Sequence, residues 1–264
     1  MRIALGVEYD GSGFAGWQSQ TDTRTVQDCV EAAVSTVANH AVRVHCAGRT
    51  DAGVHASEQV VHFDTDAVRN PRQWVYGINA NLPDDANVCW AKKLNDDFHA
   101  RFSAHSRAYR YVILNRDSRS ALLDRYAVVE HRVLDVEKMQ IAAGALLGQH
   151  DFSAFRAQGC QAKNPIRTVT RVGINRNGQL IFIDIVANAF LQHMVRNIAG
   201  MLIAIGIGKA APEWLREVLD ARDRNQGGVT APPHGLYLMR VAYPSRFGLP
   251  VGGTVSPWQL SVSV

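Results

Sequence analysis

The order in which strand patterns and helix patterns follow one another most constrains how this chain can fold. In the first hundred residues, some apolar runs alternate at every second position and others repeat every three to four positions. The runs come in the order strand, helix, strand, strand, helix, strand, which is typical of a ferredoxin-like unit. Strands are expected near residues 3–9, 42–46, 59–63 and 88–92, and helices near residues 26–37 and 72–79.

The second half of the chain repeats this pattern. Asn177-Gly178 separates two apolar runs and is typical of a hairpin turn, and Asp135 is a suitable N-cap for a helix. The expected elements are strands near 109–113, 168–175, 180–186 and 236–241, and helices near 136–147, 190–205 and from 212 onward.

The two repeats predict an α+β fold. We expect two ferredoxin-like, RRM-like β-α-β-β-α-β halves whose strands join into one mainly antiparallel (mixed) sheet, with the helices on one side. The halves are placed at residues 1–105 and 106–243. Residues 244–264 are rich in Pro, Gly and Ser, and they predict an extended or disordered tail.

Composition and charge exclude some classes of protein. No apolar run is long enough to span a bilayer, and the first residues contain no signal region, so we expect a cytoplasmic protein. The four cysteines contain no C-x-x-C pair and are expected to be reduced and mostly buried. The net charge is only +4, but segments 101–125 and 152–183 are locally basic. They indicate either a polyanion-binding face or ordinary solvated surface.

A glycine-rich stretch follows the first strand. Residues 11–16 match G-x-G-x-x-G, but a polar stretch, residues 17–24, separates them from the next helix. A dinucleotide site needs the helix to begin inside the motif, so NAD or FAD binding is disfavoured. A surface loop or a substrate-facing loop carrying Phe14 and Trp17 remains open. No P-loop and no metal-ligand spacing occurs in the chain, so we expect no cofactor and no metal.

A second glycine-bracketed stretch carries an ionisable residue. It runs from Gly48 to Ala56, with the sequence Gly-Arg-Thr-Asp-Ala-Gly-Val-His-Ala. Glycines permit the tight backbone that lifts a side chain out of a sheet edge. Arg49 could hold the Asp51 carboxylate ionised and oriented, which suits attack at carbon or stabilisation of an oxocarbenium-like centre. A turn-stabilising Arg-Asp pair is the structural alternative.

These residues resemble the catalytic signature of the TruA-type pseudouridine synthases. Further segments fit the same family in the same order, from about residue 2 to residue 243. They are Tyr9-Asp10-Gly11-Ser12, Gly16-Trp17-Gln18, Phe98 to Ala104, Tyr109-Arg110-Tyr111, His193 to Ile198, and Gly235 to Leu238.

The resemblance implies an activity, its substrate and its residues. Members of the family isomerise uridines 38, 39 and 40 in the anticodon arm of tRNA, without a cofactor and as homodimers. It implies that Asp51 is the catalytic aspartate, acting as the nucleophile or as a base that abstracts a ribose proton. Tyr109 matches the tyrosine that stacks on the target base, and Arg49 and Arg196 match arginines that flank the aspartate. Leu236 matches an apolar wall of the base pocket.

Two other functions are compatible with parts of the pattern. A non-catalytic RNA-binding protein could use the same kind of sheet, because RRM modules bind RNA on theirs. A nicotinamide-dependent oxidoreductase would have to use residues 11–16. The intact signature at Gly48 to Ala56 favours the synthase over both.

Overall fold

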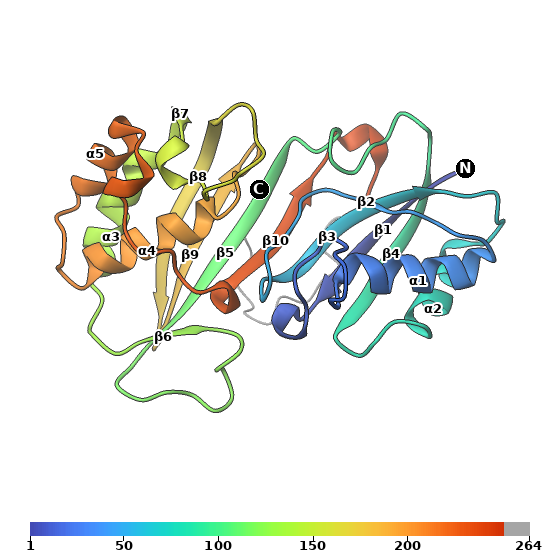
Figure 1. Cartoon of the computed structure of the whole chain (residues 1–264), viewed down its shortest axis with the longest axis horizontal. Coiled ribbons are helices and arrows are strands. Elements are labelled where there is room, and N and C mark those ends of the chain that lie inside the picture. Colours follow the sequence, from blue (N-terminus) through green and yellow to red (C-terminus); the bar gives the residue numbers. More distant parts are fainter. Residues whose placement is uncertain (251–264) are drawn as a thin grey trace. The chain divides into compact units, whose positions relative to one another are not determined.

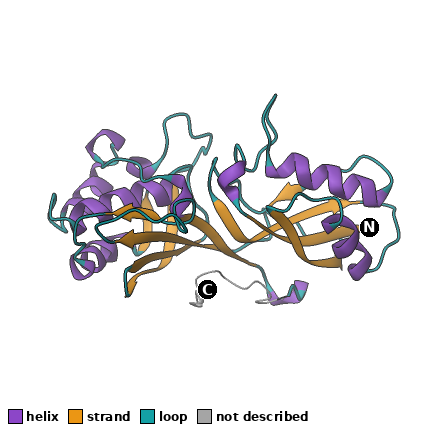
Figure 2. Cartoon of the chain, turned by 90° about the horizontal axis from the view of Figure 1, so that it is seen from below, coloured by secondary structure: helices purple, strands orange, loops and turns teal. Residues whose placement is uncertain are grey.

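The computed structural model describes residues 1–250, so most of the predicted tail lies outside the described residues. The chain divides into two compact units, which are Met1–Arg107 with the segment from Tyr237 onward, and Ala108–Leu236. The described residues form an α+β structure whose ten strands make a mixed, mostly antiparallel sheet (Figure 1). The main helices of each unit lie over one face of its strands (Figure 2). The predicted fold class is confirmed.

In the first unit, the strands follow the order β4-β1-β3-β10, and the short strand β2 also pairs with β3. Strand β1 lies inside the sheet and pairs antiparallel with both of its neighbours, which explains why most of its residues are buried. Strand β10 pairs with β3 in parallel, with Tyr237 opposite His55. The elements are β1 (Arg2–Tyr9), α1 (Val26–Ala38), β2 (His45–Cys46), β3 (His55–Asp64), α2 (Pro71–Asn79), β4 (Ala86–Leu94) and β10 (Leu236–Ala242).

Both helices of the first unit begin where capping residues predict. The side chain of Thr25 accepts a hydrogen bond from the backbone N–H of Asp28 at the start of α1. Asn70 and Gln73 form a capping box at the start of α2, and Pro71 occupies the first turn.

The second predicted strand is shorter than its alternation suggested. Only His45 and Cys46 join the sheet, although Val42 and Val44 are buried. Side chains of α1 bind the backbone instead, because Ser35 Oγ accepts from Val42 N–H and Glu31 Oε1 accepts from Val44 N–H. The alternation therefore predicted correctly that Val42 and Val44 are buried, but it was wrong to predict that they pair in the sheet.

In the second unit, the strand order is β5-β9-β8-β7, and β6 pairs with β5 in parallel. Strands β8 and β9 form the predicted hairpin, with Asn177 opposite Leu180 and Gly178 at a φ of 59°. The elements are β5 (Ser106–Asn115), β6 (Val128–Glu130), α3 (Val136–Ala143), β7 (Gly148–Asp151), β8 (Ile166–Asn177), β9 (Leu180–Ala187), α4 (Met194–Gly206) and α5 (Trp214–Ala221).

Three details of the second unit differ from the sequence prediction. Helix α3 ends at Ala143 and continues only as a 3-10 turn that starts at Gly144. Helix α4 begins at Met194 rather than near residue 190, because His193 adopts a left-handed backbone with a φ of 62°. The short strands β6 and β7 were not predicted, since neither is long enough to show a clear alternation.

Cysteine burial also differs from the prediction. All four cysteines carry free thiols, and each residue is half-buried rather than fully buried.

Candidate active site

The predicted catalytic residue, Asp51, lies in the loop that joins β2 to β3. The carbonyl oxygen of Asp51 accepts a hydrogen bond of 3.2 Å from Val54 N–H, so residues 51–54 form a tight turn. Gly53 within this turn has a φ of 76°, a conformation that favours glycine. The Asp51 side chain is half-buried, whereas Thr50 before it is buried. The loop therefore presents a carboxylate from an ordered backbone.

Thr50 fixes this loop from two directions. Its Oγ1 lies 2.8 Å from the hydroxyl of Tyr9 on β1, and the contact is buried. Its carbonyl oxygen accepts a 3.0 Å hydrogen bond from the backbone N–H of Trp17. The residue directly before Asp51 is thus held by a strand on one side and by the glycine-rich loop on the other, which limits movement of the carboxylate.

Two glycines of the glycine-rich stretch make close contact with the Asp51 loop. Gly16 has a φ of 99°, and a Cβ added there would lie 2.8 Å from the carbonyl oxygen of Thr50. A Cβ added to Gly11 would lie 2.1 Å from the carbonyl oxygen of Val54. The G-x-G-x-x-G match therefore reflects packing of one loop on another, with no room for side chains at either position.

The two aromatic side chains of the glycine-rich loop are buried. Phe14 and Trp17 are only 4% and 2% exposed, which contradicts both the surface-loop and the substrate-facing interpretations of these aromatics. The carbonyls of Gly16 and Trp17 accept hydrogen bonds from Val26 and Gln27 at the first turn of α1. The first N–H groups of a helix have no partner within the helix. The loop therefore supplies hydrogen-bond acceptors to the start of α1 while it also supports Asp51.

Arg49 carries its charge close to the predicted catalytic aspartate. Its side chain is exposed, and its pairing with Asp51 stays a prediction. Its charge also acts on Cys46: burial raises the pKa of that thiol to about 11, and Arg49 and Arg101 oppose the rise. Arg49 thus lies two residues before Asp51, with its side chain open to solvent.

His55, which closes the signature, belongs to the supporting structure. It is 2% exposed, and its ring stacks on Tyr237 with centroids 4.6 Å apart. Its Nδ1 accepts a 3.0 Å hydrogen bond from Gly11 N–H and lies 3.1 Å from Asp10 Oδ1. The histidine therefore links the glycine-rich loop, β3 and β10.

Tyr109 lies on β5 in the second unit. It is 8% exposed, and its ring packs edge-to-face against Phe190 with centroids 4.9 Å apart. The next residue, Arg110, points to the other face of the strand and forms a bidentate, buried pair with Asp184 at 2.7 and 2.8 Å. Sequence reasoning did not foresee this pair, which fixes the strand that carries Tyr109.

Arg196 lies in the first turn of α4 and is bound to a neighbouring segment. Its Nε donates to the carbonyl of Ala231 at 2.9 Å, and Ala231 N–H donates back to the Arg196 carbonyl at 3.1 Å. One turn further, a Cβ on Gly200 would lie 1.8 Å from the carbonyl oxygen of Val229. The segment that leads to Leu236, which is 6% exposed at the start of β10, is therefore packed tightly on α4.

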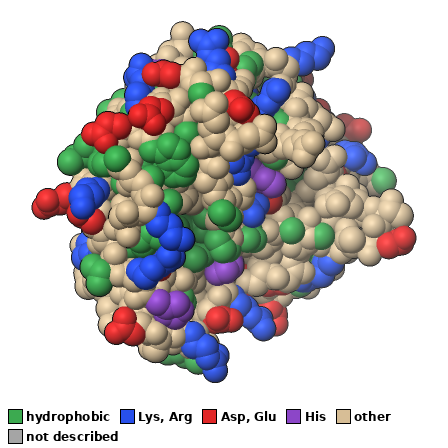
Figure 3. Space-filling view, turned by 60° about the vertical axis from the view of Figure 1, so that its left-hand side comes forward, with side chains coloured by type: hydrophobic (Ala, Val, Ile, Leu, Met, Phe, Trp, Pro, Cys, Tyr) green, Lys and Arg blue, Asp and Glu red, His purple; other side chains and the backbone are tan. Residues whose placement is uncertain are grey.

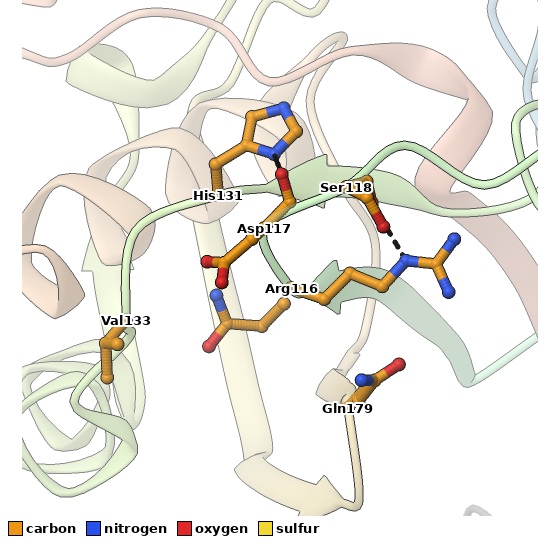
Figure 4. Close-up of a pocket in the computed structure, with 7 residues that line it drawn as sticks. Arg116, Asp117, Ser118, His131, Val133 and Gln179 are labelled. Atoms are coloured by element: carbon orange, nitrogen blue, oxygen red, sulfur yellow. Dashed lines mark hydrogen bonds between the residues drawn. The ribbon is translucent and has the colours of Figure 1, made fainter.

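A hollow with a defined lining lies elsewhere, in the second unit (Figure 4). It measures about 390 Å³ and contains none of the predicted site residues. Within its wall, His131 Nδ1 lies 3.0 Å from the carbonyl of Asp117, and Arg116 Nε donates to Ser118 at 2.8 Å. It is lined by Asn115, Arg116, Asp117, Ser118, His131, Val133 and Gln179.

The two basic segments are only partly surface features. Arg107 and Arg110 are 8% and 1% exposed, so they contribute to the interior rather than to a charged face. Arg176 donates hydrogen bonds to Asn115 and to the carbonyl of Leu134. On the face of the molecule drawn in Figure 3, Lys and Arg side chains are interspersed with Asp and Glu.

The described residues offer no obvious place for a metal or a membrane span. Within residues 1–250, no group of three or more His, Cys, Asp or Glu is arranged to hold a metal ion. No helix in that range is both long and apolar enough to cross a bilayer.

Comparison with known proteins assigns the family. The family model described as tRNA pseudouridine synthase matches residues 6–103 and 142–244. The chain belongs to this tRNA pseudouridine synthase family. The matched residues include Asp51, Arg49, Arg196 and Leu236, whereas Tyr109 falls between the two matched segments.

Curated relatives agree along nearly the whole chain. A protein named tRNA pseudouridine synthase A from Shewanella amazonensis is 56% identical over 250 residues, covering 95% of this chain and 96% of the relative. Proteins of the same name from Methylococcus capsulatus and Nitrosococcus oceani are 57% identical over 249 residues and 58% identical over 250 residues. They cover 94% and 95% of this chain, and 92% and 96% of their own lengths.

Proposed function

We propose that this protein isomerises uridines 38, 39 and 40 of the tRNA anticodon arm to pseudouridine. Membership of the tRNA pseudouridine synthase family supports this activity, and so does the name shared by relatives at 54–58% identity. The single observation that carries the proposal is the Asp51 loop. Its carboxylate-bearing turn is fixed by Thr50 and packed against Gly11 and Gly16.

The reaction is an isomerisation within one nucleotide. The C1'–N1 glycosidic bond breaks, the uracil turns while it stays bound, and a C1'–C5 bond forms. The proton on C5 is lost, and N1 gains a proton, so product and substrate have the same atoms and the same oxidation state. This chemistry requires neither an electron acceptor nor a transferred group.

We assign Asp51 the role of catalytic nucleophile. It would attack C1' as the uracil leaves; abstraction of a ribose proton is the alternative step available to a carboxylate at this position. A half-buried carboxylate on an ordered turn suits either step, because little reorganisation is needed at the moment of reaction.

The other predicted residues are assigned to the bound nucleotide. Tyr109 would stack on the target uracil, and its hydroxyl would help to move the C5 proton. Leu236 would form an apolar wall for the base. One or both of Arg49 and Arg196 would help Asp51 to ionise and would occupy the space that the flipped nucleotide leaves.

A uridine in a stem must leave the helix before it can react. Unstacking and unpairing cost a few kcal/mol, which contacts from Lys and Arg to phosphates would offset. We further propose that the protein acts in the cytoplasm as a homodimer, in which one tRNA contacts both subunits. Sedimentation of the protein with and without tRNA tests the subunit number directly.

Position mapping tests the proposed specificity. Three anticodon-arm transcripts, each with uridine at only one of positions 38, 39 and 40, are incubated with the enzyme and mapped chemically for pseudouridine. The proposal expects modification of all three. Tight binding without modification of any would favour the non-catalytic RNA-binding alternative, which the family name and the intact signature argue against.

A further inference from the structure

Phe102 in the first unit is an exposed aromatic residue on a well-ordered turn. Phe102 is 75% exposed, yet it follows β4 in a turn whose other residues are tightly bonded. The guanidinium of Arg101 lies 5.6 Å from the centroid of the Phe102 ring. We define the Phe102 platform as His45, His99, Arg101 and Phe102.

Two imidazole rings follow one another beside Phe102. The ring of His99 is 4.3 Å from the Phe102 ring at an interplanar angle of 33°. His45 lies 5.7 Å from His99. Burial lowers the pKa of His99, so this imidazole is neutral at neutral pH and can stack without charge repulsion. The platform is therefore a row of neighbouring tilted rings whose last member, Phe102, is open to solvent.

The turn that carries Phe102 has little freedom. His99 Nδ1 accepts hydrogen bonds from the backbone N–H groups of Arg101 and Phe102, at 3.1 and 3.3 Å. The carbonyl of Ala100 accepts a 2.7 Å bond from the hydroxyl of Tyr243, and Ala100 N–H donates to His62. The Phe102 ring is therefore held on an ordered turn and is open to solvent.

A buried arginine ties the platform to the catalytic loop. Arg107 donates from one guanidinium nitrogen to the carbonyls of Arg101 and Ala47, at 2.8 and 3.0 Å. Ala47 directly precedes Gly48 and Arg49, the start of the Asp51 signature. Arg101 and Arg49 also act on the same thiol, that of Cys46. The exposed aromatic and the exposed Arg49 therefore lie in one neighbourhood of the first unit.

We propose that the Phe102 platform stacks an unpaired nucleobase of the tRNA anticodon arm while Asp51 acts on the target uridine. The proposal rests on the proposed function, because it gives the same substrate a second contact. Aromatic side chains beside cationic groups suit unpaired RNA, since every base has a π face and a nearby phosphate.

A second copy of the chain suits this surface less well. In a two-fold interface centred on the platform, the same patch meets itself, so Arg101 would face Arg101. That arrangement brings two positive charges together, whereas RNA would bring negatively charged phosphates to Arg101.

The test compares Phe102 with a matched aromatic on the same unit. Tyr76 on α2 is 65% exposed, and the guanidinium of Arg72 lies 5.1 Å from its ring. Equilibrium binding of an unmodified tRNA transcript is measured for Phe102→Leu, Phe102→Trp and Tyr76→Leu, each in an Asp51→Asn background that prevents turnover. We expect Phe102→Leu to raise Kd roughly tenfold, with Phe102→Trp and Tyr76→Leu unchanged within about twofold.

Each other outcome overturns the proposal in a recognisable way. If Phe102→Leu binds the transcript as tightly as its parent, or if Tyr76→Leu loses as much affinity, then Phe102 does not stack on a base. A loss that accompanies dissociation of a dimer in sedimentation assigns Phe102 to a subunit interface. Pseudouridine formation by the protein with native Asp51 is assayed separately, so its absence refutes the proposed activity while the binding ratio still tests the platform.

Discussion

Replacement of Gly16 by alanine tests whether the glycine-rich loop holds the Asp51 loop in place. An alanine at the Gly16 φ of 99° costs roughly 1–2 kcal/mol of backbone strain. The added Cβ would lie 2.8 Å from the Thr50 carbonyl oxygen, and such overpacking costs roughly 1–3 kcal/mol. The expected loss of unfolding free energy is therefore about 2–5 kcal/mol.

The same substitution should reduce activity beyond its effect on stability. Relief of the clash moves the Thr50 carbonyl and carries Asp51 with it, and a misplacement of about 1 Å can cost roughly a hundredfold in rate. We expect the folded fraction of Gly16→Ala to lose at least tenfold in single-turnover rate on a tRNA transcript.

Gly178→Ala is the matched control. Gly178 also has a positive φ, of 59°, but no atom lies within 4 Å of an added Cβ. The Gly178→Ala variant should lose about 1–2 kcal/mol of unfolding free energy and keep the wild-type single-turnover rate. Urea unfolding and single-turnover assays measure both quantities. Equal stability and full activity for Gly16→Ala and Gly178→Ala would refute the argument that Gly16 positions the Asp51 loop.

Three further substitutions test separate parts of the account. Asp184→Ala should cost about 3–5 kcal/mol in urea unfolding, because it removes the carboxylate that pairs with the buried Arg110 guanidinium; a loss below about 1 kcal/mol would contradict this. Tyr109→Phe should keep tRNA affinity and react more slowly in a single-turnover assay, and an unchanged rate would exclude proton transfer by the hydroxyl. Burial raises the pKa of Glu58 to about 7, so the protein should lose up to about 3 kcal/mol relative to Glu58→Gln as pH rises from about 4.5 to 7.

The sign of the Glu58 effect follows from proton binding. In this pH range the unfolded chain releases the Glu58 proton while the folded chain keeps it, so stability falls with rising pH. Burial lowers the pKa of His62 to about 4, which gives the opposite trend, since stability is lost as pH falls below about 6.5. His62 is present in both proteins, so its contribution cancels. A pH-independent difference would refute the assignment to Glu58.

Much of the fold was predictable because local signals and tertiary packing agree. Thr25 and Asp135 cap helices where the sequence indicates, and Gly178 turns the predicted hairpin. Where local and tertiary demands differ, prediction failed. Val42 and Val44 alternate as a strand does, but Ser35 and Glu31 bind their N–H groups instead.

The candidate site was predictable only in part. The Gly48 to Ala56 stretch pointed to Asp51 because it resembles the catalytic signature of the TruA-type pseudouridine synthases. Spacing alone left a turn-stabilising Arg-Asp pair as an alternative. Its supports were not predictable from spacing, since Gly16 and Thr50 are far apart in sequence and meet only in the fold. A charge count could not reveal that Arg107 and Arg110 are buried, because burial depends on partners such as Asp184.

The central claim, that Asp51 carries out the isomerisation, is tested most directly by tritium release. Transcripts labelled at C5 of uridine are incubated with wild-type protein or with Asp51→Asn, with neither metal nor cofactor added, and tRNA binding and thermal unfolding are measured on both. We expect release by the wild type alone, with nearly equal tRNA affinity and unfolding temperature for the variant. Release by folded Asp51→Asn, or none by the wild type from any anticodon-arm substrate, would contradict it.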